Sequence, residues 1–190
     1  MAIRTDKVRS ALTAARQKKL IVQFSRPFEP GSITGYVKAV GERFFLLAVL
    51  DDSLQFEQYS CLRIADVRNF EAPSKRDAFY KAVRKLRGDK IPPAIKVDLT
   101  NACSILRTLH PSVVTIHREQ VSPDTCIIGR TTSDNNVHFE FLEIDPDGKW
   151  ESEPSYYRLN QITRVDLPGP YEKALLLVGG EPNLEAFYLR

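Results

Sequence analysis

Two stretches of the chain repeat the same alternation of apolar runs and polar turns. They run from residue 35 to 70 and from residue 129 to 165. In each, a Gly opens an apolar run, an acidic turn follows a second apolar run, and an Arg in a short Leu/Ile/Tyr segment closes the unit. The spacing from Gly35 to Arg63 differs by one residue from the spacing from Gly129 to Arg158. Such self-similarity predicts a tandem duplication.

The first half of the pattern predicts one helix followed by five strands. Apolar residues recur at helical spacing between Thr5 and Lys19, which predicts an amphipathic helix. Short β-branched and apolar runs separated by Gly, Pro and Asp then predict strands. These strands are expected at residues 20–24, 32–40, 43–50, 58–64 and 66–70.

A second helix is expected from Ser74 to Arg87, with Ser74 and Asp77 spaced as a capping box. Helical spacing predicts a buried stripe of Phe79, Val83 and Leu86. The other faces carry six cations, namely Lys75, Arg76, Lys81, Arg84, Lys85 and Arg87.

The second half repeats the order after a Pro-rich linker at residues 91–96. A helix is expected at residues 98–109, and strands at 112–117, 125–131, 137–144, 155–159 and 162–165. Residues 171–176 then match the place of residues 80–83. The tail ends in an apolar segment, Leu184 to Leu189, which needs a surface to pack against.

These elements predict an α+β fold of two tandem small β-barrels of the SH3-like or Sm-like type, each preceded by a helix. The expected domains are residues 1–90, with the basic helix at their end, and residues 97–190, with the tail. Closure of each sheet would leave few strand edges exposed.

The charge is divided unevenly between the halves. Residues 1–95 contain 18 Lys and Arg and 10 Asp and Glu, a net charge of +8, whereas residues 96–190 contain 9 and 14, a net charge of −5. This asymmetry indicates an anionic partner for the first half, attraction between copies of the chain, or uneven solvated surfaces. No apolar run approaches the roughly 18 residues that span a bilayer, and no signal peptide is evident, so we expect a cytosolic protein without a membrane partner.

Motifs for catalysis and metal binding are absent from the sequence. His110, His117 and His138 lack ligand spacing, and the acidic turn after Ile144 lacks the calcium-loop pattern. The three cysteines are odd in number and far apart, which is typical of buried thiols. We therefore expect no enzyme, no cofactor and no metal site. The cysteines are Cys61, Cys103 and Cys126.

Arg63 and Arg158 are the polar residues most suited to a ligand, because an Arg in a strand can direct its planar fork at a phosphate or stack on a base. The alternative is an ion pair with a neighbouring carboxylate. The basic helix is the second candidate, with Tyr80 available for stacking. A solvated helix face is the alternative there.

The segments Leu62–Val67 and Tyr157–Ile162 resemble the second motif of Sm and Hfq-type RNA-binding proteins, in which an Arg is followed by Ile or Val four residues later. Ile64 and Leu159 stand where that motif has Gly. The run Arg43–Leu46 with the later segment around Arg63 is also similar to the WYL sensor domain. There Phe44, Phe45 and Leu46 stand for Trp, Tyr and Leu, and Asp66 and Gln161 replace a second Arg.

The Sm-like resemblance implies a non-enzymatic, bacterial-type protein that binds RNA or another polyanion and forms homo-oligomers. The nucleic-acid contacts would come from Arg63, Arg158, Lys75, Arg76, Tyr80, Lys81, Arg84, Lys85 and Arg87. An assembly module without nucleic acid and a WYL-like sensor of small ligands are the alternatives.

Overall fold

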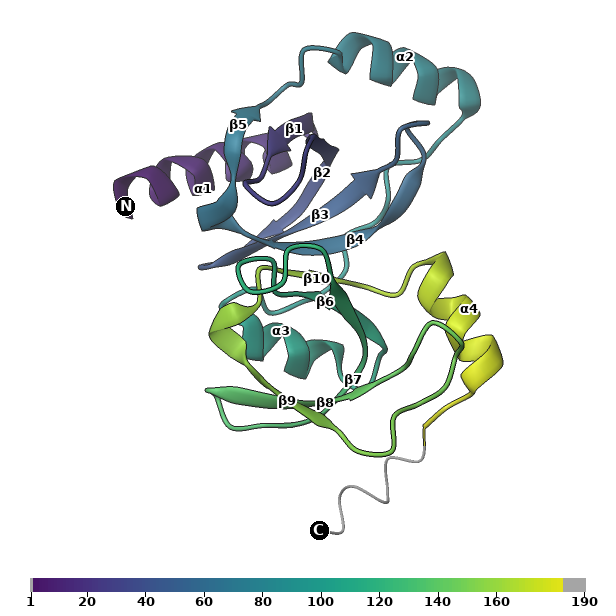
Figure 1. Cartoon of the computed structure of the whole chain (residues 1–190). Coiled ribbons are helices and arrows are strands. Elements are labelled where there is room, and N and C mark those ends of the chain that lie inside the picture. The colour runs from purple at the N-terminus through teal and green to yellow at the C-terminus, as the bar shows by residue number, and fades with distance from the viewer. Residues whose placement is uncertain (1, 183–190) are drawn as a thin grey trace. The chain divides into compact units, whose positions relative to one another are not determined.

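The computed structural model describes the chain from residue 2 to residue 182, with side chains from residue 5. The chain divides into a first unit, Met1–Asn101, and a second unit, Ala102–Arg190 (Figure 1). The predicted linker at residues 91–96 falls within the first unit. The apolar tail segment, Leu184 to Leu189, lies outside the described residues.

The first unit combines helices at both ends with five antiparallel strands. The strands are hydrogen-bonded in the order β5-β1-β2-β3-β4. A 3-10 turn, η1, which the sequence pattern did not predict, joins β4 to β5. The elements are α1 (Ala2–Gln17), β1 (Ile21–Ser25), β2 (Ser32–Val40), β3 (Phe44–Leu50), β4 (Phe56–Arg63), η1 (Ile64–Asp66), β5 (Arg68–Glu71) and α2 (Asp77–Arg87).

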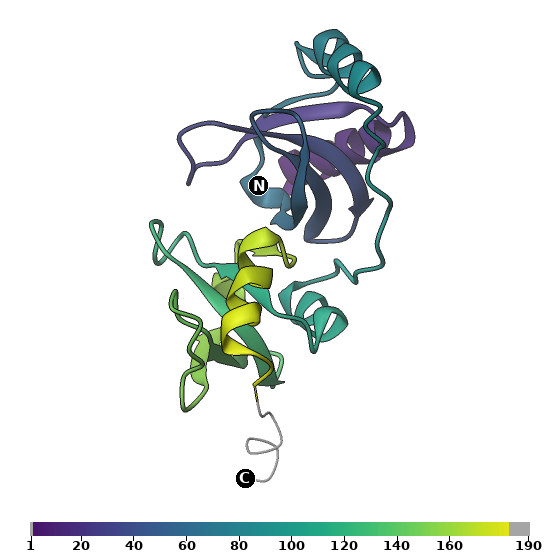
Figure 2. The same cartoon turned by 90° about the vertical axis from the view of Figure 1, so that its right-hand side faces the viewer.

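The second unit contains the same elements in the same order. Its strands are ordered β10-β6-β7-β8-β9, and a 3-10 turn again follows the fourth strand. The elements are α3 (Ala102–Leu109), β6 (Val114–His117), β7 (Cys126–Asp134), β8 (His138–Glu143), β9 (Ser155–Arg158), η2 (Leu159–Gln161), β10 (Arg164–Asp166) and α4 (Pro170–Gly179). Figure 2 shows α4, in yellow, in front of the strands of this unit.

Details of strand pairing support the duplication. The pairing of β2 with β3 shifts register two residues after Gly35, and that of β7 with β8 shifts two residues after Gly129. Both glycines lie where a Cβ would collide with a cross-strand carbonyl oxygen, of Ala48 and of Leu142 respectively. The prediction that the two halves share one strand order is confirmed. The glycines recur because only glycine allows the neighbouring strand to come this close.

The prediction of closed barrels is wrong. Within the described residues, the two edge strands of the first unit, β5 and β4, do not pair with each other. The same holds for β10 and β9 in the second unit. In the first unit β5 has four residues and bonds to β1, and the core is covered by α1 and η1. The sheets are open and their apolar faces are covered by helices and turns.

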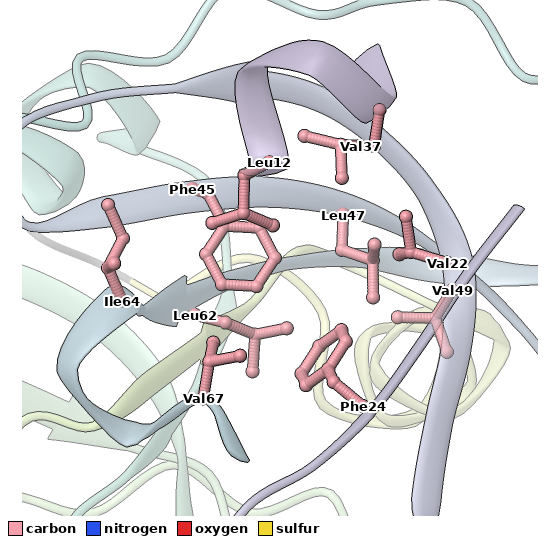
Figure 3. Packing of buried hydrophobic residues seen from close by; sticks show 11 residues of the cluster. Leu12, Val22, Phe24, Val37, Phe45, Leu47, Val49, Leu62, Ile64 and Val67 are labelled. Atoms are coloured by element: carbon pink, nitrogen blue, oxygen red, sulfur yellow. The ribbon is translucent and has the colours of Figure 1, made fainter. Parts of the chain in front are cut away.

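Strand β3 is buried over its whole length because apolar side chains cover both of its faces. Phe45, Leu47 and Val49 point into a cluster with Leu12 of α1 and Phe24 of β1 (Figure 3). The alternate residues Ala48 and Leu50 pack into a second cluster, which contains Tyr80 of α2. Alternation along one strand therefore places α1 and α2 on opposite faces of the sheet.

Helix α2 is oriented differently from the sequence prediction. It begins at Asp77 and its N-cap residue, Arg76, makes no side-chain cap, so the capping box starting at Ser74 is wrong. Its buried residues are Tyr80 and Arg84, whereas Phe79 and Leu86 are exposed. Of the predicted stripe only Val83 packs against the core.

The second unit is organised around aromatic side chains of β8. Phe139 and Phe141 are buried and meet edge to face, and Leu106 of α3 and Ile116 of β6 are fully buried with them. Cys126 at the start of β7 is exposed, so the prediction of three buried thiols holds for Cys61 and Cys103 and fails for Cys126. Among the helices of residues 2–182, none has the length and apolar character needed to cross a membrane.

Candidate functional site

A pocket of about 350 Å³ lies in the first unit beside the start of β3. The turn between β2 and β3, the end of β4, η1 and helix α1 meet there. Its lining gathers three arginines from three separate segments of the chain. The lining residues are Thr5, Asp6, Arg9, Glu42, Arg43, Arg63 and Ala65. We call it the first-unit pocket.

Arg63 is held in this pocket by a carboxylate of its own 3-10 turn. Its Nε donates to Asp66 Oδ2 at 2.6 Å and its Nη2 to Asp66 Oδ1 at 3.1 Å. The Asp66 side chain is nearly buried, and the Arg63 side chain is about one-fifth exposed. Of the five N–H donors of the guanidinium, this pair occupies two, and it neutralises the charge that a phosphate would seek.

The other two arginines of the first-unit pocket differ in how far they are engaged. Arg9 donates to Asp6 and, at 2.7 Å, to the backbone carbonyl of Glu42, so it ties α1 to the turn before β3. Arg43 is exposed, and no hydrogen bond or ion pair of its side chain occurs among the described residues. With Glu42 beside Arg43, the pocket carries both signs of charge.

A pocket of about 290 Å³ lies at the corresponding place in the second unit. The correspondence is fixed by the backbone, because Ile64 N donates to Arg43 O in the first unit and Leu159 N donates to Val137 O in the second. The lining residues are Asn136, Val137, His138, Arg158, Leu159 and Asn160. We call it the second-unit pocket.

Arg158 has no partner of the kind that holds Arg63. Gln161 ends η2 where Asp66 ends η1. Arg158 is exposed, and its side chain makes no hydrogen bond or ion pair within residues 5–182. Among residues 5–182, no carboxylate lines the second-unit pocket. An uncompensated guanidinium therefore faces a cavity that also offers two amides and an imidazole.

The turn that forms one wall of the second-unit pocket is fixed by a polar network. Arg107 of α3 donates to Asp134 and to Asn136, and the Cys103 thiol donates to Asp134. The hydrogen bond from Arg107 lowers the pKa of Asp134. Burial, together with the bond to Asp134, raises the pKa of Cys103 to about 11, so it is a neutral thiol donor. The wall is therefore held in place by side chains of α3.

The six cations predicted for the basic helix lie outside the linings of both pockets, and most have internal partners. Arg84 is buried and donates to the carbonyls of Leu54 at 2.9 Å and Lys90 at 2.7 Å. Arg87 donates to the carbonyl of Ser53. Lys75 pairs with Glu71, Lys81 pairs with Asp77, and Arg76 lies over the rings of Phe79 and Tyr80. Lys85 is exposed, without a side-chain partner among residues 5–182. The predicted basic surface is thus in part a set of structural contacts.

Sequence reasoning singled out Arg63 and Arg158 but missed the residues around them. The internal repeat carried the missing signal, because the residues just before the third strand of each half, Arg43 and Val137, align once Gly35 and Gly129 are aligned. Arg9 could not be found in this way, since it reaches its pocket from α1. Within the described residues, no three His, Cys, Asp or Glu side chains gather as a metal ion would require.

The fold and the pockets define an α+β protein with two related antiparallel units. No protein-family model, no curated protein and no solved structure matches the chain.

Proposed function

We propose that the protein binds single-stranded RNA or a related polyanion without catalysing a reaction, and that the second-unit pocket receives a phosphate and the adjoining base. The observation that carries this proposal is the guanidinium of Arg158, which has no partner among residues 5–182 and faces a pocket without carboxylates. A planar guanidinium in such a setting suits a phosphate, because it can donate two parallel hydrogen bonds.

The remaining lining suits a nucleobase. The Asn160 amide offers a donor and an acceptor, as base edges require, and the His138 ring offers a surface for stacking. The Asn136 amide offers its N–H donors, because its oxygen already accepts from Arg107. A volume of about 290 Å³ lies at the lower end of the range for ligand pockets, roughly 300–1,000 Å³. A single nucleotide of a flexible strand fits this size better than a large cofactor.

The first unit contributes charge to the same function. Its net charge of +8 attracts a polyanion at long range, and exposed cations such as Arg43 and Lys85 can contact the backbone without reading sequence. The resemblance of the closing Arg segments to Sm-like proteins supports the same class of ligand.

A WYL-like response to a small ligand is the second candidate. The observation that favours it is the first-unit pocket, whose mixed charges from Arg43 and Glu42 suit a compact zwitterionic molecule. Such a ligand would bind as a free molecule, whereas the main proposal requires a strand.

The test measures fluorescence anisotropy of labelled twelve-nucleotide oligouridylate and oligoadenylate at two salt concentrations. Arg158→Ala removes the guanidinium, and Gln161→Asp places a carboxylate where Asp66 stands in the first unit, so it blocks Arg158 without removing it. Arg16→Ala is the matched control, because Arg16 is exposed on α1 outside both pockets. Each variant lowers the net charge by one.

We expect Arg158→Ala and Gln161→Asp to weaken binding by about tenfold or more, since a charge-assisted hydrogen bond contributes roughly 1.5–3 kcal/mol. The control should weaken it by no more than about threefold, because an exposed cation acts through screened charge alone. Equal losses in all three variants would reject the pocket, and absence of RNA binding at low salt would reject the function. Binding of nucleoside monophosphates with no gain for the oligonucleotide would favour the small-ligand candidate.

A further inference from the structure

Helix α2 is fixed with an apolar face directed away from its own unit. Tyr80 and Arg84 face the sheet, where Tyr80 packs against Tyr36 and Arg84 bonds to two backbone carbonyls. Because residues on opposite sides of a helix point apart, Phe79, Ala82 and Leu86 face outward. Phe79 is 51% exposed and Leu86 is 89% exposed. In Figure 1 one side of α2 faces the strands and the other faces away from the unit.

Helix α4, the corresponding helix of the second unit, presents a similar outer face. Glu172 and Leu175 are buried, and Glu172 accepts bonds from Thr115 and from the backbone of Gly169. Trp150 donates to the carbonyl of Gly180 and fixes the other end. Leu177 is 88% exposed and Val178 is 76% exposed. The outer face comprises Tyr171, Ala174, Leu177 and Val178.

The two faces belong to units of opposite net charge. The outer face of α2 is flanked by Lys81 and Lys85 and follows Arg76. The face of α4 lies beside the turn after β8, whose Gly148 lies close to Val178. Asp145 and Asp147 of this turn are balanced by the exposed Lys149 and Lys173. The net charges of +8 and −5 also hold for the two units, because Lys96 and Asp98 cancel.

We propose that the outer face of α2 in one copy of the chain docks on the outer face of α4 in a second copy. Both faces are apolar, both belong to short helices at matching positions of the repeat, and the units that carry them have opposite net charge. The contact is heterologous, so each chain has one free face of each kind and can join further chains until a ring closes.

The size of the faces sets the strength of the contact. Helices of eleven and ten residues are about 15–17 Å long. One such face is much smaller than the roughly 800 Å² per partner of a stable interface. We therefore expect association at protein concentrations on the order of tens of micromolar or higher.

Leu86→Gln and Leu177→Gln test this contact in the full chain. Glutamine keeps the helix propensity and the net charge, and both leucines are exposed, so the fold is untouched. Val121→Gln is the matched control, because Val121 is an exposed apolar residue, 53% exposed, outside both helices. Sedimentation velocity between about 5 and 500 µM measures the mass, a range that brackets the expected affinity.

We expect the wild-type protein and Val121→Gln to form species larger than one chain, and each leucine variant alone to remain a single chain. A mixture of the two leucine variants should form a species of two chains, because one variant keeps its α4 face and the other its α2 face. The species should weaken as salt rises, since opposite charges assist it.

Four results would overturn the proposal. A wild-type protein that stays a single chain over the whole range removes the contact. Association that survives Leu177→Gln while Leu86→Gln abolishes it indicates a contact between two α2 helices. A mixture that forms no two-chain species excludes the heterologous arrangement. Flotation of single-chain wild-type protein with phosphatidylglycerol vesicles, lost in Leu86→Gln, assigns the face to a lipid surface.

Discussion

Asp166 on β10 links the stability of the second unit to pH. It is nearly buried and accepts hydrogen bonds from His117 Nε2 at 2.9 Å and from Arg164 Nε at 2.7 Å. Burial alone would raise the pKa of this carboxyl, but the charge of Arg164 and the bond and charge of His117 outweigh burial and lower the pKa from 3.8 to about 2. The folded unit therefore favours the ionised carboxylate.

The sign and the size of the effect follow from this shift. Because the pKa is lower in the folded state, the stabilisation is present above the unfolded value near 3.8 and is lost as the pH falls through about 2. A depression of that size corresponds to about 2 kcal/mol of unfolding free energy. Replacing Asp166 with Asn removes the titration and leaves a neutral group of similar shape.

The assay is urea unfolding followed by tryptophan fluorescence. Trp150 is the single tryptophan of the chain and lies in the second unit, so its emission reports on that unit. We expect the gap in unfolding free energy between wild type and Asp166→Asn to narrow by about 2 kcal/mol between about pH 5 and pH 2. Asp124→Asn, at an exposed position, should show no such narrowing. A constant gap between wild type and Asp166→Asn would refute the reasoning.

Two further substitutions test the fold directly. Gly129→Ala should lower the unfolding free energy by more than about 3 kcal/mol, because its Cβ would collide with the Leu142 carbonyl. Gly31→Ala, where no atom lies within 4 Å of the added Cβ, should be nearly neutral, and equal thermal unfolding temperatures of the two variants would contradict this reading. Arg84→Met should cost about 1–3 kcal/mol, since two backbone carbonyls lose their donor. Lys85→Met should cost much less in the same urea titration, and a similar loss in both would count against the structural role of Arg84.

Most elements could be predicted from the sequence because their local signals agree with the tertiary structure. Gly35 and Gly129 marked the repeat, and the structure gives the reason, which is the close approach of a neighbouring strand. Strand β3 was recognised as a continuous apolar run because both of its faces are covered. Barrel closure was not predictable in this way, since it depends on whether edge strands pair, and that is set by contacts far apart in the chain.

Helix α2 shows where periodicity misleads. Phe79, Val83 and Leu86 are apolar and recur at helical spacing, which predicts that they form the buried face. The structure buries Tyr80 and Arg84 instead. A long arginine can occupy an inward position when backbone carbonyls accept its donors, and Leu54 and Lys90 supply them. A hydropathy pattern assigns every arginine to the solvent-facing side of a helix. The sequence therefore predicts Arg84 on the exposed face of α2, although the structure buries it.

The candidate pockets required the same kind of long-range information. The sequence predicts Arg63 and Arg158 as equivalent residues, and an ion pair with a neighbouring carboxylate is the alternative for both. The structure places Arg63 in such a pair and gives Arg158 no partner within residues 5–182. The difference lies in one aligned position, Asp66 against Gln161, so comparison of the repeats could have revealed it once the 3-10 turns were known.

The two units keep in common the features that shape the backbone and differ in residues that line the two pockets. The glycine, the register shift two residues later and the 3-10 turn after the fourth strand occur in both, and each is needed for strand geometry. The partner of the closing Arg differs, and so does the residue before the third strand, which is Arg43 in one unit and Val137 in the other. If both pockets served one identical ligand, the same uncompensated charge would be needed in each. Under the proposed function, the exchange of Asp66 for Gln161 separates the roles, since a neutralised Arg63 holds its turn while Arg158 would be available to an anion.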